Sequence, residues 1–281
     1  ISLHDCWSFT GHCTFYDSIG CERWKTQCYA CPKKDKYPRS YLLDNSRKNY
    51  VDKKRIFTSA RNLQLVTPSQ WLADQLAQSF LKDVPVKVIH NGVDLAAFSP
   101  DYDIKLLEKY QFGDKKVVVG VASIWDERKG LAEFVQLQNQ LPENYQIVLV
   151  GLSAAQIETL PVGILCIPRT ESLAELNALY ARADVYANPT FQDNFPNTNI
   201  EALASGTPVV AYQTGGCPEA IDEQTGMIVP VGDVSALATA ILKITTTDRD
   251  KIRAACRQRG QAHFDKQDRY LDYLNLYESL I

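Results

Sequence analysis

Residues 190–221 read TFQDNFPNTNIEALASGTPVVAYQTGGCPEAI, and this segment holds two strand-to-helix junctions in succession. The stretch 197–205 predicts a helix, 208–212 predicts a short buried strand, and Gly215 and Gly216 follow that strand directly. Glycine lets a backbone come close to another group. In open parallel sheets, ligands bind outside the carboxyl ends of the strands. The segment therefore predicts two loops that face one binding site.

Strand and helix patterns alternate on both sides of this segment, which predicts a doubly wound parallel sheet. The apolar run 115–123 is continuous, as expected for a strand covered by helices on both faces. Further strands are predicted at 63–69, 86–94, 145–151 and 184–190, and helices at 70–81, 130–141, 172–183, 233–244, 248–264 and 268–280. Ser69 is placed to cap the first of these helices.

The loops at the strand ends indicate an anionic ligand. Helices expected to start near Asn197 and Pro218 would present backbone N–H groups and positive dipole ends, and Lys129 adds a full charge. The simplest such ligand is a diphosphate. Because Asp193 and Glu201 would repel it, we expect these carboxylates to bind neutral hydroxyl groups. Two sugars that flank one diphosphate describe a nucleotide sugar.

The composition is that of a globular protein, and its charge is unevenly placed. The chain has 281 residues, 45% hydrophobic and 22% charged, with a net charge of −3. It contains no run of about 18 apolar residues that could span a membrane. Residues 1–61 carry twelve Lys or Arg against six Asp or Glu, and ten of these basic residues lie in 33–61. This basic segment is either ordinary solvated surface or a patch that faces anionic lipid or a phosphorylated substrate.

Cysteines gather near the start of the sequence. Five of the eight precede residue 32, and Cys28 and Cys31 have the spacing of a zinc knuckle. Cys13 and Cys21 could complete a structural zinc site, with His12 or Cys6 as substitutes. Reduced thiols are the equal alternative, and disulfides are less favoured because the rest of the chain is typical of a cytoplasmic protein.

Several motifs together resemble the retaining GT-B glycosyltransferases of family four. Asp193 and Glu201 resemble the family's paired acids, residues 88–100 (VIHNGVDLAAFSP) its turn into the second domain, and 127–130 (ERKG) its lysine-glycine pair. Residues 214–221 and 225–241 resemble the next loop and the following helix. The Cys-rich opening is similar to that of bacterial colanic-acid or capsule-type polysaccharide transferases.

The resemblance implies a GT-B fold, of which this chain holds one complete Rossmann-like domain and the tail of another. The implied boundaries are residues 1–94 for the first-domain part, 95–262 for the donor-binding domain, and 263–281 for a C-terminal helix that crosses back. The family's first-domain glycine-rich loop has no match, and its expected position is upstream of Ile1. Activity of this chain alone is therefore an open question.

The resemblance also assigns roles. Glu201 corresponds to the acid that holds the ribose, Asp193 to the acid near the donor sugar, and Lys129 to the diphosphate-binding lysine. The family's usual arginine seat holds Ile124, and Arg128 could replace that charge. His4 matches a histidine that faces the donor sugar. The remaining donor contacts are expected at Asn194, Phe195 and Pro196 through backbone groups, and at Gly215 and Gly216.

The expected function is metal-independent transfer of a sugar from a UDP or GDP sugar to a saccharide or lipid-linked saccharide. The Asp-Tyr-Asp at 101–103 mimics a metal motif, but its place favours helix capping. A nucleotide-sugar epimerase or hydrolase and a non-catalytic binding module are the alternatives. We expect a cytoplasmic protein, peripheral to the inner face of an anionic membrane, with no nucleic-acid partner.

Overall fold

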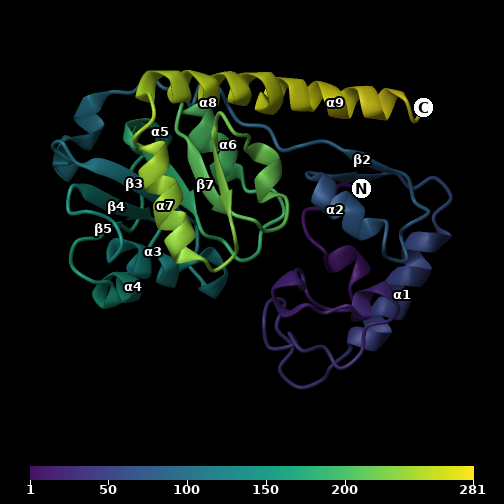
Figure 1. Cartoon of the computed structure of the whole chain (residues 1–281). Coiled ribbons are helices and arrows are strands. Elements are labelled where there is room, and N and C mark those ends of the chain that lie inside the picture. Colours follow the sequence, from purple (N-terminus) through teal and green to yellow (C-terminus); the bar gives the residue numbers. More distant parts are fainter. The chain divides into compact units, whose positions relative to one another are not determined.

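The computed structural model describes residues 1–281, which form two compact units, Ile1–His90 and Asn91–Ile281. Figure 1 shows the residues of both units, coloured from the N-terminus to the C-terminus. We call them unit 1 and unit 2 and describe each by itself.

Unit 2 is built on a six-stranded parallel sheet with the order β5-β4-β3-β6-β7-β8 (Figure 1). The order reverses direction between β3 and β6, which makes their carboxyl ends the topological switch point. The strands are β3 (Lys116–Val121), β4 (Tyr145–Val150), β5 (Leu165–Ile167), β6 (Val185–Asn188), β7 (Val209–Tyr212) and β8 (Gly226–Val229). The predicted parallel α/β architecture is confirmed, although β5 and β8 were not foreseen.

Helices cover both faces of this sheet. In β3, Val117 and Val119 join one apolar cluster and Val118 joins the other, because successive strand residues point to opposite faces. The first cluster is closed by α5 (Leu173–Arg182), α6 (Asn197–Ala204) and α8 (Arg249–Phe264), and the second by α3 (Leu131–Gln138) and α7 (Val234–Ile244). Shorter elements are α4 (Ala154–Thr159) and a 3-10 helix, η4 (Ile104–Tyr110).

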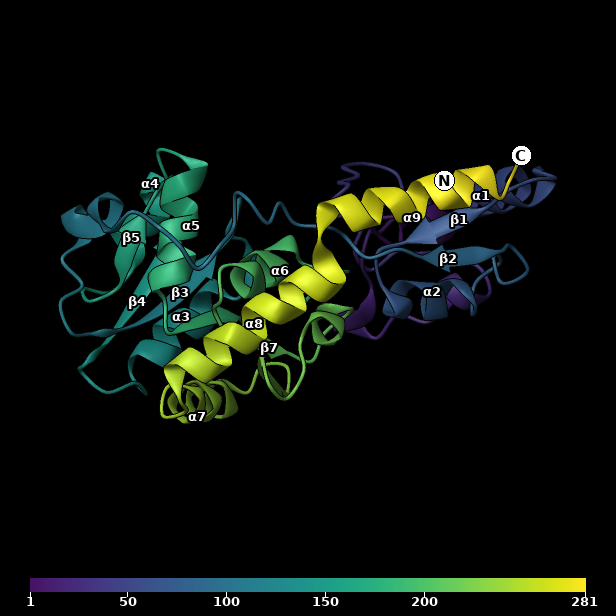
Figure 2. The same cartoon turned by 90° about the horizontal axis from the view of Figure 1, so that it is seen from above.

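The last two helices follow each other with one break. The extended backbone of Asp265 ends α8, and its side chain accepts a hydrogen bond from the Gln267 N–H to cap α9 (Lys266–Glu278). Figure 2 shows the change of direction at this point. The N–H of Val93 donates to the Phe264 carbonyl at 2.7 Å, which attaches the start of unit 2 to the same break.

Unit 1 has a smaller sheet and a single core. Strands β1 (Leu65–Thr67) and β2 (Val86–Val88) are parallel, and Ser2 bridges to Val66 in parallel beside them. Its helices are α1 (Ser46–Ser59) and α2 (Gln70–Leu76), both visible in Figure 2. The core is aromatic: the rings of Tyr16 and Trp24 stack with centroids 4.6 Å apart.

Two predicted helix caps are confirmed by the structure. Ser69 accepts the N–H of Leu72 at 3.1 Å as the predicted cap of α2. Asp103 caps η4 by accepting the Lys105 N–H at 3.0 Å, which confirms capping for the Asp-Tyr-Asp stretch. Helix α1 was missed because its sequence is mainly polar and basic, so it lacks a wide apolar stripe.

Candidate active site at the carboxyl edge of the large sheet

Three loops leave the carboxyl edge of the unit 2 sheet next to its switch point. Residues 122–130 follow β3, 189–196 follow β6, and 213–216 follow β7. β3 and β6 are neighbours in the sheet, and so are β6 and β7. The parallel sheet thus gathers the predicted donor-binding residues of unit 2 at one edge, as the sequence indicated.

The first two loops are held together through Gly130. Its φ of 72° lies in the left-handed region, and a Cβ there would stand 2.2 Å from the carbonyl oxygen of Pro189. Beside it, the Phe191 N–H donates to the Arg128 carbonyl at 2.7 Å. Only glycine allows this contact, because any side chain would meet backbone.

The second and third loops are joined in the same way. Gly215 has a φ of 51°, and a Cβ on it would lie 1.7 Å from the Asp193 carbonyl oxygen. The Gly216 N–H donates to the Asn194 carbonyl at 2.9 Å. The two glycines were predicted to allow close approach to a ligand; the structure shows in addition that Gly215 allows close approach between two loops of the protein.

Lys129 and Asp193 meet between these loops. The Lys129 Nζ lies 2.6 Å from Asp193 Oδ2, and their side chains are 23% and 18% exposed. The sequence treated them as separate contacts for a diphosphate and for a sugar. The structure joins them into one partly buried ion pair at the switch point, where incomplete hydration strengthens electrostatic attraction.

Glu201 lies in α6 and is partly buried. Its Oε2 accepts a hydrogen bond from the Tyr180 hydroxyl of α5 at 3.0 Å. Burial raises the pKa of Glu201 above its usual value, and the Tyr180 hydrogen bond partly offsets this rise. Tyr180 was not predicted as a site residue, because the position looked like one more apolar contact of a helix.

The segment before α6 is more buried than the sequence suggested. Asn194, Phe195 and Pro196 are all buried. The Phe195 ring packs on Phe264, with centroids 5.8 Å apart, so its side chain belongs to the core.

Asn91, which is distant in sequence, holds the same segment through hydrogen bonds. Its Nδ2 donates to the Phe195 carbonyl at 3.3 Å and to Asn197 Oδ1 at 2.8 Å. Asn91 therefore positions the start of α6. The Asn-Gly turn that contains Asn91 was the available sequence signal, although it did not reveal these partners.

Two local expectations at this edge differ from the structure. Residues Cys217–Ala220 form a single 3-10 turn, so no α-helix starts at Pro218 and the anion-attracting helix end is that of α6. Arg128 pairs with Asp126, with Nε 3.2 Å from Oδ2, and its side chain is 38% exposed. Ile124 is also exposed, so an apolar side chain stands in the family's arginine seat.

The predicted residues of unit 1 lie in two places. His4 is exposed. It lies two residues after Ser2, which pairs in parallel with Val66 of β1. In the loop region, a hydrogen bond with Cys13 lowers the pKa of Cys31 to about 7, and Cys28 Sγ accepts the Gly11 N–H at 3.1 Å. Nevertheless, no three His, Cys, Asp or Glu side chains in residues 1–281 are arranged to hold a metal ion.

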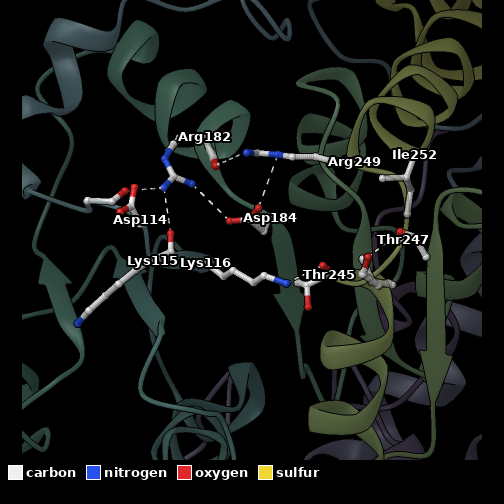
Figure 3. A pocket seen from close by; sticks show the side chains of 11 residues that line it. Asp114, Lys115, Lys116, Arg182, Asp184, Thr245, Thr247, Arg249 and Ile252 are labelled. Carbon is white, nitrogen blue, oxygen red and sulfur yellow. Dashed lines mark hydrogen bonds and ion pairs between the residues drawn. The ribbon is translucent and has the colours of Figure 1, made fainter.

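A cavity of about 420 Å³ lies at the opposite, amino edge of the unit 2 sheet (Figure 3). Arg182 and Arg249 both contact Asp184, at 3.3 and 3.6 Å. Lys116 Nζ donates to the Thr245 carbonyl at 2.6 Å. Because the protein itself engages these charges, the cavity is a structural network and not the candidate active site.

Residues 115–247 match the family described as "Glycosyl transferases group 1". This part of the chain is similar to group 1 glycosyltransferase domains. The match covers β3 to the end of α7, and thus all three loops of the carboxyl edge. The match confirms the predicted resemblance to glycosyltransferases and the predicted enzyme class.

Curated relatives agree with this family. The chain is 27% identical over 290 residues to WcaC of Escherichia coli K12, whose name describes a colanic acid biosynthesis glycosyl transferase; the alignment covers 99% of the chain and 68% of WcaC. It is 30% identical over 193 residues to a GDP-mannose-dependent phosphatidylinositol monomannoside mannosyltransferase of Mycolicibacterium smegmatis. That alignment covers 62% of the chain and 50% of the relative.

Solved structures confirm the GT-B fold. Sucrose-phosphate synthase of Thermosynechococcus elongatus superposes with a TM-score of 0.71 and 23% identity, over 90% of this chain and 66% of that one. HepE of Anabaena, solved with UDP, gives a TM-score of 0.71 and 20% identity, over 83% and 68%. No helix in residues 1–281 is long and apolar enough to cross a bilayer.

Proposed function

We propose that this chain carries the donor-binding side of a retaining glycosyltransferase. The whole protein would move a sugar from a nucleotide-diphosphate sugar to a saccharide or lipid-linked saccharide. The observation that supports this proposal most is the Lys129–Asp193 ion pair at the switch point of the sheet. Retention of anomeric configuration rests on the resemblance of Asp193 and Glu201 to the family's paired acids.

Lys129 would bind the diphosphate by changing partners. In this structure its ammonium is held at 2.6 Å by one carboxylate oxygen. A diphosphate placed outside β3 and β6 would offer more acceptor oxygens and more negative charge, and so would draw the ammonium away. The N-terminus of α6, which begins at Asn197, would face the same anion.

This exchange would free Asp193 for the donor sugar. A carboxylate can accept hydrogen bonds from two hydroxyl groups. Glu201 would hold the ribose hydroxyls, with Tyr180 keeping its carboxylate in place. Because Lys129 and α6 would stabilise the leaving diphosphate, we propose that transfer needs no catalytic metal. The donor would carry UDP or GDP, consistent with UDP in HepE and with the GDP-mannose named for the mannosyltransferase relative.

His4 would act on the donor sugar, as the family resemblance implies. His4 is exposed and comes just after a segment that pairs in parallel with β1, and the family's histidine likewise follows a strand. We expect His4→Ala to abolish sugar transfer by the whole protein while UDP or GDP affinity stays unchanged. A parallel loss of nucleotide affinity would contradict this assignment.

Calorimetry with UDP, GDP and their nucleosides tests the donor site. Lys129→Ala should lower affinity for the binding diphosphate about 10- to 100-fold, as for hydrogen bonds to charged groups, and leave nucleoside affinity unchanged. Lys115→Ala removes an exposed lysine from the amino edge of the same sheet and is the matched control. Equal losses for diphosphate and nucleoside, or an equal loss in the control, would refute the assignment.

Two other functions give different results. An epimerase or hydrolase of nucleotide sugars would convert the donor without an acceptor, whereas a binding module would not convert it at all. Incubating the whole protein with the bound donor, with and without saccharide acceptors, separates these outcomes. We expect donor consumption to depend on the acceptor.

A structural zinc at Cys13, Cys21, Cys28 and Cys31 stays a prediction. In its favour, a hydrogen bond with Cys31 and burial raise the pKa of Cys13, and the nearby thiols of Cys28 and Cys21 add to this rise. Against it, the thiols do not form a group of three placed to hold a metal. We expect elemental analysis of the purified chain to find about one zinc per chain. Metal-free protein with freely titrating thiols would refute the prediction.

A further inference from the structure

Four large apolar side chains of unit 1 stand outside its core. Tyr37, Tyr41, Leu42 and Leu43, which we call the apolar tip, are 82%, 81%, 88% and 70% exposed. Single exposed apolar residues are ordinary, but a group of this size in one loop marks an interaction surface.

The loop that carries the apolar tip is tied down at both ends. The Ser40 N–H donates to the Lys34 carbonyl at 2.7 Å. Asp44 accepts from the Cys31 N–H at 2.6 Å and from the Ser46 N–H at 2.8 Å, which fastens the loop to the start of α1. The apolar side chains are therefore exposed on a loop whose backbone is held in place.

Helix α1 continues this surface with positive charge. Its buried side contains Ser46, Tyr50 and Lys53. The four other basic side chains of the helix are exposed, and we call them the basic helix face: Arg47, Lys48, Lys54 and Arg55. Lys34, Lys36 and Arg39 in the loop are exposed as well.

The acids of this region do not cancel its positive charge. Asp35, Asp44 and Asp52 stand against the seven exposed Lys and Arg side chains of the loop and helix. Asp52 lies 3.4 Å from Arg55 on the same helix. The surface as a whole is therefore apolar at the loop and positive along the helix.

We propose that the apolar tip and the basic helix face together dock unit 1 on an anionic phospholipid bilayer. Tyrosine and leucine enter the interfacial region, while Lys and Arg are attracted to acidic headgroups. Neither signal is strong alone, and reversible attachment without an anchor usually combines two. The proposal is independent of sugar transfer.

The structure also removes one residue from the basic surface. Lys53 is buried, and its Nζ donates to the Trp7 carbonyl at 2.6 Å and to the Thr10 carbonyl at 3.0 Å. It is part of the packing of unit 1, and a charge reversal there would disturb the fold. Test variants must therefore use exposed residues of α1.

Vesicle sedimentation of the full chain tests the proposal. The protein should bind phosphatidylcholine vesicles that contain phosphatidylglycerol, bind pure phosphatidylcholine vesicles much less, and be released by salt. Lys54→Glu with Arg55→Glu should lower binding at least about tenfold, since each basic residue near the surface is worth roughly 1 kcal/mol. Leu42→Ser with Leu43→Ser should also lower it several-fold, because the tip loses apolar area.

Matched variants in unit 2 control for charge and for apolar area. Lys105→Glu with Lys243→Glu changes the net charge equally, and Ile104→Ser with Val162→Ser removes two exposed apolar side chains. Neither pair should affect binding. Circular dichroism checks folding, and calorimetry with UDP or GDP should give unchanged affinity in every variant.

Three results would overturn the proposal. These are equal binding to both kinds of vesicle, binding to neither, and equal losses in the test and control variants. If vesicles are not bound while a purified protein saturates the surface and is released by the Leu42 and Leu43 changes, the apolar tip is a protein-binding site instead. Nucleotide affinity is measured separately, so these results do not bear on the donor site.

Discussion

The two edges of the unit 2 sheet carry similar residues to different effect. At the amino edge, lysines and arginines surround a cavity of about 420 Å³. At the carboxyl edge, three loops are packed so closely that a Cβ at Gly215 would overlap a carbonyl oxygen. A cavity lined by charged side chains does not by itself identify a binding site.

The difference lies in what the charges already contact. Arg182 donates to the carbonyl of Lys115 at 2.9 Å, and Arg249 donates to that of Arg182 at 3.1 Å, so these guanidinium groups join segments of the protein. Lys129 instead meets one carboxylate, a partner that a diphosphate can replace. A group whose contacts can be exchanged serves a ligand, whereas one held by backbone carbonyls serves the fold. Four predictions test this contrast.

The largest effect is expected from Gly215 at the carboxyl edge. Gly215→Ala would force a left-handed φ on alanine and place its Cβ against the Asp193 carbonyl, and should lower the free energy of unfolding by on the order of 3 kcal/mol or more. Nucleotide binding should be lost with the loop geometry. Urea unfolding and calorimetry measure the two effects.

Gly113→Ala is the control for this change. Gly113 also has a left-handed φ, of 54°, but a Cβ there would meet nothing within 4 Å. We expect a loss of only about 1 kcal/mol from backbone strain, with full nucleotide affinity. If the two alanine variants behave alike, the close packing of the carboxyl edge is not what maintains the site.

The next effect should come from Glu201→Gln. The change keeps the shape of the side chain but weakens its hydrogen bonds to ribose hydroxyls, so nucleotide affinity should fall by roughly 1–3 kcal/mol. The free energy of unfolding of the variant should not fall and should instead stay the same or rise. Because burial raises the pKa of Glu201, the folded state favours the protonated acid.

The raised pKa of Glu201 also predicts how the stability of the native chain changes with pH. Between the ordinary pKa of glutamate, 4.5, and the higher pKa in the folded state, the unfolded chain binds fewer protons than the folded one. The free energy of unfolding therefore decreases as pH rises through this interval. Glu201→Gln should remove this decrease and should be at least as stable as the native chain at neutral pH. Thermal melts across pH would show a contradiction if the variant kept the native slope.

A smaller effect is expected from Arg249→Ala at the amino edge. Its side chain is 52% exposed and shares Asp184 with Arg182, so we expect a loss of about 0.5–1 kcal/mol in stability. Nucleotide affinity should not change. A loss of affinity comparable to that of Lys129→Ala would mean that the cavity of Figure 3 takes part in binding.

The smallest effect is expected from Asp193→Asn. Without its carboxylate, Lys129 no longer has to leave an anionic partner, so affinity for UDP or GDP should stay the same or rise by up to about 1 kcal/mol. Sugar transfer by the whole protein should nevertheless fall, because the donor sugar loses a strong acceptor. A clear fall in affinity for the free diphosphate would contradict the partner exchange proposed for Lys129.

The sequence determined the architecture of unit 2 and the location of its candidate site. Continuous apolar strands, capped helices and glycine at the strand ends are local signals, and in a parallel sheet they place the loops at one edge. Lys129, Asp193 and Glu201 could therefore be singled out before any fold was known. The basic segment was also visible, but its apolar tip was not, because exposure depends on what the rest of unit 1 covers.

Only the tertiary structure decided which of these residues contact one another. Lys129 and Asp193 are 64 positions apart along the chain, and their ion pair exists because β3 and β6 are neighbours in the sheet. Phe195 became a core residue and Lys53 a buried one for the same reason: burial and pairing depend on segments that are distant in sequence. A residue's type limits the chemistry it can perform, but its partners are chosen by the packing of the whole unit.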